Sequence, residues 1–311
     1  MMKKALMDML ICPACLPQEN ELSLHVEQIL DEDVIQGQLT CSNCAEVFLI
    51  RDGLADLDPG RAQRSHSKYE QSTVVSSYLW SHYGDLLQEE QASKAYDQWV
   101  RLMHPHFGVC LDIGSAVGRF AFEMAQKCDF VLGLDNSVAF IQAARELMLH
   151  GRKTLQLPDE GRLTLSAHLK LPQAWNRDNV EFIVADAQAL PVRSKYFSSA
   201  ASLNMVDKVP HPLTHLTESN RILARRNAQF LLSDPFSWSQ EAAREQDWLG
   251  GLESGPYAGY GLQNITTMLQ EEAGPLAPPW SIQDQGQVWW KIRTHSNHFE
   301  LIRSCWVKAG R

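Results

Sequence analysis

The central part of the chain alternates short apolar runs with segments whose apolar residues recur at helical spacing. The runs have the length of buried strands and lie at residues 109–113, 130–135, 180–186, 197–203 and 228–234. Helices are predicted after the first run, from Ser137 onward and over 212–225. Alternation of strands and helices at this spacing predicts a mainly parallel sheet that is covered on both faces.

The end of the chain departs from this alternation. QVWWKIR (287–293) and HFELIRSCWVK (298–308) have no helix between them, so we expect an antiparallel hairpin at the sheet edge. The predicted fold class is therefore α/β, with a doubly wound, mainly parallel, seven-stranded Rossmann-like sheet. The segments 151–179 and 236–262 interrupt the regular pattern, and we expect them to form a lid that contains Trp238 and Trp248.

The first sixty residues follow a strand-like pattern instead. Two strands are predicted at 21–30 and 33–40, around an acidic turn, and a third at 47–53. A polar linker and two helices with aromatic residues on one side precede the central alternation. The chain is thus predicted to divide into a small β module (1–58), a linker with N-terminal helices (59–107) and the α/β domain (108–311).

Four of the seven cysteines form two CxxC pairs in the first module, Cys12 with Cys15 and Cys41 with Cys44. In a reducing compartment this pattern indicates metal binding before disulfide formation. Four thiolates fit a closed, tetrahedral structural zinc site, so the module is predicted to be a zinc ribbon. A redox role is disfavoured because neither pair begins a helix in a βαβ unit, and four unrelated thiols are the remaining alternative.

Composition and charge narrow the classes of partner. The 311 residues carry a formal net charge of −9. Residues 1–60 hold three basic against eleven acidic side chains, a balance of −8, which argues against nucleic-acid binding. No apolar run approaches the roughly 18 residues of a membrane span. Asp8 interrupts the apolar stretch that follows the N-terminal lysines, so we expect no export signal and a cytoplasmic location.

The segment LDIGSAVGRF (111–120) predicts a strand that ends in a glycine turn and continues as a helix. Gly114 and Gly118 allow a ligand to approach the backbone where the helix begins. Both a nicotinamide dinucleotide and S-adenosylmethionine bind at such turns. The GxGxxG fingerprint of dinucleotide enzymes is missing, because only these two glycines are present.

Acidic residues at the ends of successive predicted strands favour S-adenosylmethionine. Asp135 ends the second strand, where a carboxylate can accept hydrogen bonds from both ribose hydroxyls. Asp186 follows the third strand, where it would lie beside the adenine, a position that a nicotinamide enzyme does not need. The predicted cofactor residues are Asp112, Gly114, Ser115, Gly118, Arg119, Asp135, Asn136, Asp186, Ala187 and Asn204.

The stretch from MLICPACL to LTCSNCAEVFLIRDGLADL, residues 7–57, resembles the small zinc-ribbon proteins that activate tRNA and translation-factor methyltransferases. Those proteins also follow the second cysteine pair with a strand and Arg-Asp-Gly, here Arg51-Asp52-Gly53. The resemblance implies a ribbon that packs on a methyltransferase and is fused to it in this chain.

Residues 74–311 resemble the C-terminal methyltransferase domain of ovothiol-synthesis enzymes, which N-methylate the imidazole of 4-mercaptohistidine. The matching stretches are SSYLWSHYG, LDIGSAVGRFAFEMA, GLDNSVAFIQAA, VEFIVADAQAL, LNMVDKV and SDPFSWSQEAAREQDWLGG. Ser115 stands where that family has cysteine, Asn136 where it has an aromatic residue, and a zinc ribbon where it has a sulfoxide-synthase portion. The resemblance implies an acceptor pocket bordered by His82, Tyr83, Asn204 and Asp207.

Simpler roles exist for these acceptor-side residues: His82 and Asp207 could cap helices, and Tyr83 could be packing. We expect an S-adenosylmethionine-dependent methyltransferase that N-methylates a small polar molecule, such as an imidazole or a histidine derivative. The alternatives are an RNA methyltransferase with a zinc recognition module and a non-catalytic activator. The charge of the ribbon argues against the first, and the intact Asp135 and Asp186 argue against the second.

Overall fold

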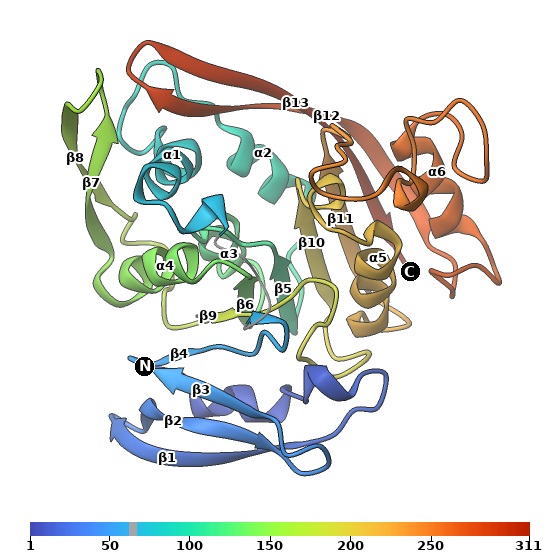
Figure 1. The fold of residues 1–311 in the computed structure, drawn as a ribbon, viewed down its shortest axis with the longest axis horizontal. Coiled ribbons are helices and arrows are strands. Elements are labelled where there is room, and N and C mark those ends of the chain that lie inside the picture. The colour runs from blue at the N-terminus through green and yellow to red at the C-terminus, as the bar shows by residue number, and fades with distance from the viewer. Residues whose placement is uncertain (62–66) are drawn as a thin grey trace.

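The computed structural model describes residues 1–61 and 67–311 (Figure 1). Its centre is a seven-stranded sheet in the order β12-β13-β11-β10-β5-β6-β9. The strands are β5 (Val109–Ile113), β6 (Phe130–Asp135), β9 (Val180–Val184), β10 (Ser199–Leu203), β11 (Gln229–Asp234), β12 (Ser281–His295) and β13 (His298–Gly310). Strands β9, β6, β5, β10 and β11 pair in parallel, whereas β13 is antiparallel to both β11 and β12. The predicted parallel sheet and its C-terminal edge hairpin are confirmed.

Helices cover the sheet on both faces. In Figure 1, α3 (Arg119–Met124) and α4 (Val138–His150) lie on one side, and α5 (Pro212–Ile222) and α6 (Gly261–Gln270) lie on the other. The chain leaves β5 for β6 and β9 and then returns to the other side of β5 as β10. In a doubly wound sheet this reversal places the ligand at the carboxyl ends of the central strands.

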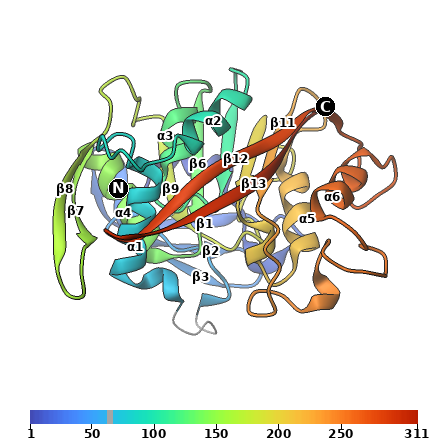
Figure 2. The same cartoon turned by 90° about the horizontal axis from the view of Figure 1, so that it is seen from above.

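Two further helices and the long C-terminal hairpin enclose one end of the sheet. Helices α1 (Ser72–Tyr83) and α2 (Ala95–Leu102) pack against β12. Seen from above, β12 and β13 cross the molecule together from the C-terminus towards α1 (Figure 2). The Nε1 of Trp290 on β12 donates to Ser304 Oγ on β13 at 3.1 Å, so the two strands are also joined through buried side chains.

The two segments expected to form a lid have different structures. Part of 151–179 folds into a two-stranded hairpin, β7 (Arg152–Pro158) and β8 (Thr164–Lys170), that packs beside α1 and α4. The segment 236–262 is largely irregular, and in it the rings of Trp238 and Trp248 stack with centroids 6.2 Å apart.

The first module is an antiparallel sheet in the order β1-β2-β3-β4. Its strands are β1 (Leu22–Leu30), β2 (Asp33–Cys41), β3 (Val47–Arg51) and the short β4 (Leu54–Ala55), which the sequence pattern did not indicate. Leu39 and Phe48 face inward as register partners on β2 and β3 and are buried. Alternation of such apolar residues with polar ones gives this sheet one packed face.

The ribbon docks on the free edge of the large sheet. Leu57 N donates to Val184 O at the end of β9 at 2.8 Å, and Ile11 N donates to Pro191 O at 3.0 Å. Leu6 and Leu10 of the ribbon belong to the same hydrophobic core as Val192 of the large domain. The two modules therefore share a continuous core, and the ribbon supports the strand that precedes Asp186.

Candidate metal, cofactor and acceptor sites

The four cysteines of the two CxxC pairs converge in the ribbon. Their sulfur atoms all lie within 4.8 Å of one another, and the Cys12–Cys44 and Cys15–Cys41 Sγ–Sγ distances are both 3.7 Å. A tetrahedral zinc with Zn–S bonds of about 2.3 Å requires sulfur atoms about 3.8 Å apart. The arrangement therefore fits a zinc ion whose four positions are all filled by protein.

Hydrogen bonds around these sulfur atoms also favour thiolate ligands. The backbone N–H groups of Asn43 and Cys44 donate to Cys41 Sγ at 3.4 and 3.5 Å, and Asn43 Nδ2 donates to Cys15 Sγ at 3.6 Å. Donors of this kind stabilise the negative charge of a metal-bound thiolate. A closed site with such support is structural, because it leaves no position for a substrate.

The glycine turn after β5 has the backbone conformation that its sequence indicated. Gly114 and Gly118 have φ of +75° and +88°. A Cβ at Gly118 would lie 2.6 Å from Phe182 Cζ, so the turn has no space for a larger residue there. Tyr83 is fully buried, and its hydroxyl donates to Val117 O at 2.7 Å. Tyr83 thus holds the turn in place, and this hydrogen bond supports a positioning role for it.

Asp135 at the end of β6 is tied to this turn. Its Oδ2 accepts from Ala116 N at 3.1 Å and its Oδ1 from Ser137 N at 2.9 Å. Burial raises the pKa of Asp135 to about 6, so the carboxylate form predominates at neutral pH. The next residue, Asn136, is exposed, and its carbonyl accepts from Arg61 Nη2 at 2.8 Å. Each oxygen of Asp135 thus has one further lone pair with which it can accept a hydrogen bond.

Two buried side chains beside the turn each have one oxygen atom without a partner among the described residues. Asp112 and Ser115 are each 2% exposed, and in the described part of the chain neither Asp112 Oδ2 nor Ser115 Oγ has a hydrogen-bond partner. Burial raises the pKa of Asp112 to about 8. Buried polar atoms nearly always have a hydrogen-bond partner. Two such atoms without one at the same turn indicate a place for ligand atoms. These residues fit a cofactor with a polar tail, as S-adenosylmethionine has.

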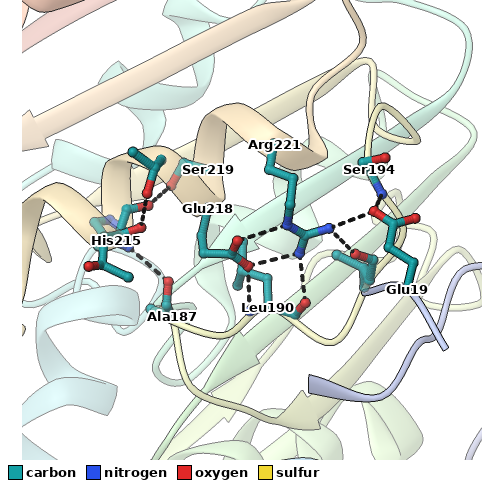
Figure 3. Close-up of polar contacts among 11 residues, drawn as sticks. Glu19, Ala187, Leu190, Ser194, His215, Glu218, Ser219 and Arg221 are labelled. Carbon is teal, nitrogen blue, oxygen red and sulfur yellow. Dashed lines mark hydrogen bonds and ion pairs between the residues drawn. The ribbon is translucent and has the colours of Figure 1, made fainter. Parts of the chain in front are cut away.

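Side chains of helix α5 hold the loop that follows β9 (Figure 3). His215 Nδ1 donates to Ala187 O at 3.3 Å, which leaves Nε2 to accept from Ser202 Oγ at 2.8 Å. Burial lowers the pKa of His215 to about 4, so the ring is neutral. Asp186 accepts from Gln188 N at 2.9 Å. The sequence did not single out His215, because nothing in its local pattern distinguishes it from other helical residues.

The same helix also connects this loop to the ribbon. Arg221 donates to Leu190 O at 2.9 Å and to Glu19 Oε1 at 3.2 Å, and it pairs with Glu218 at 2.8 Å (Figure 3). Glu218 in turn accepts from Leu190 N at 3.0 Å. The segment that carries Asp186 and Ala187 is therefore held by side chains of α5 and of the ribbon.

Arg119 is held by protein groups on several sides. Its guanidinium pairs with Asp85 at 2.7 Å and with Glu123, and it donates to His82 O at 2.8 Å. The ring of Trp175 lies 4.9 Å from its Cζ. These contacts make Arg119 an anchor between α1 and α3, and its contact with a cofactor stays a prediction.

The acceptor-side residues after β10 are held by the next strand and the C-terminal hairpin. Asn204 has φ of +59°, and its Oδ1 accepts from Ser304 Oγ at 2.6 Å. Asp207 is 1% exposed; its Oδ2 accepts from Ser237 N at 2.8 Å, whereas its Oδ1 has no hydrogen-bond partner among residues 1–61 and 67–311. An unpaired carboxylate oxygen at this depth is able to accept an N–H from an acceptor molecule.

Asp234 at the end of β11 is a second buried carboxyl that the sequence analysis missed. It accepts from Phe236 N at 2.7 Å and from Asp207 N at 3.3 Å. Burial, and then the charge of Asp207, raises the pKa of Asp234 well above its ordinary value. Burial also raises the pKa of Asp207, but Lys208 Nζ lies 3.1 Å from its Oδ2 and favours the charged form. We therefore assign the negative charge of this carboxyl pair to Asp207 and the proton to Asp234.

His82 lies on α1 and contacts a residue that the sequence did not indicate. Its Nε2 is 2.5 Å from Tyr96 Oη, and its Nδ1 lacks a partner within the described residues. Burial, and then the charge of Arg119, lowers the pKa of His82 well below its ordinary value, so the imidazole is neutral. The ring of Tyr78 lies between those of His82 and Tyr69. Its centroid is 6.1 Å from that of His82 and 6.0 Å from that of Tyr69.

Tyr69 lies just before α1 and contacts the start of α4. Its ring centroid is 5.7 Å from that of Phe140, and its carbonyl accepts from Ser137 Oγ at 3.2 Å, two residues after Asp135. Burial raises the pKa of Tyr69. No sequence motif marked Tyr69, because its place depends on how the segment before α1 crosses the ends of the strands.

Two family models match this chain. Residues 3–53 match the Trm112p-like protein family, and residues 111–229 match a methyltransferase domain. The chain thus combines a Trm112p-like ribbon with a methyltransferase domain. No curated protein gives a significant match. None of the described helices is both long enough and apolar enough to cross a membrane.

Three solved structures of low identity are similar to this chain. The complex of the Haloferax volcanii Trm112 methyltransferase activator with a candidate methyltransferase has a TM-score of 0.48 at 12% identity, covering 80% of this chain and 100% of that one. A candidate methyltransferase of Bacillus halodurans has a TM-score of 0.43 at 12% identity, covering 69% and 97%. A SAM-dependent methyltransferase of Methanosarcina mazei has a TM-score of 0.41 at 18% identity, covering 65% and 91%.

Proposed function

We propose that the chain is an S-adenosylmethionine-dependent methyltransferase that N-methylates a small polar molecule, such as an imidazole or a histidine derivative. The methyltransferase-domain match and the placement of Asp135 beside the glycine turn support the cofactor. The proposal of a small substrate rests on the burial of the acceptor-side groups, because His82 is 3% and Asp207 1% exposed. Groups this deep suit an acceptor that enters the protein whole.

The chemistry asks little of the protein beyond positioning. When bound, the cofactor supplies a methyl group on a positively charged sulfur. A neutral imidazole or amine nitrogen is already nucleophilic, so orientation is the main contribution of the residues around it. In this proposal the unpaired Oδ1 of Asp207 accepts the N–H of the acceptor and later its proton, and the neutral His82 offers its unpaired Nδ1.

Turnover with a methyl-labelled donor over a panel of imidazoles, amines and bulk RNA tests this proposal. We expect label on an imidazole or amine nitrogen. Asp207→Asn should lower kcat by more than tenfold, roughly the scale of one acid–base group, and leave cofactor affinity unchanged. Label on RNA alone, with binding that weakens steeply as salt rises, would contradict the small-molecule assignment.

An RNA methyltransferase is the second candidate, and the Trm112p-like match favours it. Ribbons of this kind resemble activators of methyltransferases that act on macromolecules. Against it stands the charge of residues 1–60, which would repel phosphates. A non-catalytic activator would bind the cofactor without any turnover, so the same panel separates all three functions.

A further inference from the structure

His82 on α1 and Tyr96 on α2 form a buried pair. The Nε2 atom of His82 lies 2.5 Å from the hydroxyl oxygen of Tyr96, and the centroids of the two rings are 4.0 Å apart. His82 is 3% exposed and Tyr96 is 8% exposed. Among the described residues, His82 is the one hydrogen-bond partner of this hydroxyl. The direction of this bond therefore determines which polar atoms of the pair remain for a ligand.

The imidazole of His82 is neutral, so it carries one proton on one of its two nitrogens. Burial, and then the charge of Arg119, lowers its pKa well below the ordinary value. Arg119 is close because its Nη1 donates to the backbone oxygen of His82 at 2.8 Å. Two arrangements of the pair are then possible. Either the hydroxyl of Tyr96 donates to an unprotonated Nε2, or a protonated Nε2 donates to the hydroxyl oxygen.

The chemistry of the two groups favours the hydroxyl of Tyr96 as the donor. A phenol is a stronger acid than the N–H of a neutral imidazole, and an imidazole nitrogen is a stronger base than a phenol oxygen. The distance of 2.5 Å is typical of an O–H donor, whereas N–H donors lie about 2.7–3.2 Å from their acceptors. Because Nε2 of His82 accepts this bond, the single proton of its ring resides on Nδ1.

The Nδ1–H of His82 is a buried donor that lacks a partner in the described part of the chain. The end of α1 that carries it is fastened to the glycine turn. Tyr83 Oη donates to Val117 O at 2.7 Å, and Arg119 at the start of α3 donates to His82 O. Buried donors nearly always have an acceptor. This N–H beside the turn therefore indicates an acceptor atom that a bound molecule supplies.

We propose that Tyr96 is a positioning residue: its hydroxyl holds His82 as the Nδ1–H tautomer, and the imidazole then donates a hydrogen bond to an oxygen atom of the methyl acceptor. The nitrogen that receives the methyl group needs its own lone pair, so the bond from His82 goes to a different atom, such as a carboxylate oxygen. His82 is not a general base in this arrangement, because Tyr96 occupies its unprotonated nitrogen. The identity of the bound molecule rests on the proposed function, whereas the tautomer does not.

Nitrogen NMR of the full chain, isotope-labelled in its histidine rings, tests the tautomer. The signals of His82 are those that disappear in His82→Gln, and we expect a protonated Nδ1 and an unprotonated Nε2. Tyr96→Phe keeps the aromatic ring and removes the donor, so the two signals should move towards each other as both tautomers become populated. Tyr78→Phe is the matched control. The Tyr78 ring centroid is 6.1 Å from that of His82, but no hydrogen bond joins the two side chains within the described residues, so the signals should stay in place.

Two results of this measurement would overturn the proposal. One is a protonated Nε2 in the unchanged chain, a result that needs no variant and so does not depend on how well Tyr96→Phe folds. The other is a set of His82 signals that is identical in the unchanged chain and in Tyr96→Phe.

Methyl transfer to L-histidine and to histamine tests the donor role, because both compounds carry an imidazole and only L-histidine has a carboxylate. We expect L-histidine to be the better acceptor. Tyr96→Phe should raise its KM at least about fivefold, the scale of one hydrogen bond, and leave kcat and the affinity for S-adenosylmethionine within about twofold. Equal KM values for the two compounds, or an unchanged KM in Tyr96→Phe, would refute the contact with an acceptor oxygen. Transfer to neither compound would contradict both this contact and the proposed substrate class, while the spectra would still decide the tautomer.

Discussion

Asp135 is the residue at which cofactor binding should depend on pH. Burial raises its pKa to about 6, and only the ionised form can accept hydrogen bonds from both ribose hydroxyls. The affinity for S-adenosylmethionine should therefore be full above this pKa and fall as the pH drops through it. Asp135→Asn should weaken binding by roughly 1.5–3 kcal/mol, the size of hydrogen bonds to a charged group, and remove the pH step. Calorimetry from pH 5 to 8 measures both effects, and an unchanged step in Asp135→Asn would assign it elsewhere.

Gly118 is the residue at which the turn tolerates least change. Alanine there combines an unfavourable φ of +88° with a Cβ 2.6 Å from the ring of Phe182. We expect Gly118→Ala to destabilise the chain by about 2 kcal/mol or more, measured by urea unfolding. Gly161→Ala is the matched control, because Gly161 also has a positive φ, +59°, but no atom within 4 Å of the added Cβ. Equal losses in the two variants would mean that the contact with Phe182 costs nothing.

At the residue scale, sequence reasoning located the four-cysteine cluster, because CxxC spacing brings such groups together. Asp135 lies at the end of β6 beside the glycine turn, and its contact with a cofactor stays a prediction. The ion pair of Arg119 with Asp85, 34 positions earlier, was not predicted, because it depends on how α1 packs on α3. Contacts between elements so far apart in the chain have no local signature.

At the element scale, helix α5 should contribute to acid sensitivity through His215. Burial lowers the pKa of His215 to about 4 from an ordinary value of 6.5, so the unfolded chain binds this proton more tightly than the folded one. Stability should be full above pH 6.5 and fall as the pH drops from there to about 4. The total is on the order of 3 kcal/mol, at about 1.4 kcal/mol per pH unit.

His215→Gln isolates this contribution, because glutamine can still donate to Ala187 O and accept from Ser202 without titrating. The free energies of unfolding of the two proteins, measured by urea titration at several pH values, should converge towards pH 4. A difference that stays constant across this range would mean that His215 titrates normally in the folded chain.

Elements with a repeating pattern were the ones that the sequence predicted well. β5, β6 and β10 are short runs of mostly buried residues, and the β12–β13 hairpin was expected because no helix separates its two strands. The short β4 and the β7–β8 hairpin were missed as strands. β4 has only two residues, and its pairing with β3 depends on the tight turn at Asp52-Gly53. β7 and β8 are amphipathic strands whose buried side faces helices and not the main sheet, so neither has the continuous apolar run that marked the central strands.

On the scale of the whole molecule, the ribbon and the methyltransferase domain should unfold together. Leu6 and Leu10 lie in one core with Val192, and Arg221 joins Glu19 of the ribbon to the loop after β9. The two modules share a core, and main-chain hydrogen bonds to Val184 and Pro191 join them. Unfolding of one module would therefore expose the core of the other. We therefore expect a single thermal transition for the native chain.

Zinc should control that transition. We expect one tightly held zinc per chain, because Cys12, Cys15, Cys41 and Cys44 already lie at tetrahedral distances and metal binding supplies folding free energy to such ribbons. The double variant Cys41→Ser, Cys44→Ser should lose the metal and lower the midpoint of the whole transition, since the edge of β9 loses its support. Cys305→Ser, outside the cluster, should change neither. Elemental analysis and calorimetry measure the two effects. Full zinc retention in the double variant would refute the ligand assignment, and a loss of zinc without any shift of the main transition would show that the ribbon is energetically separate.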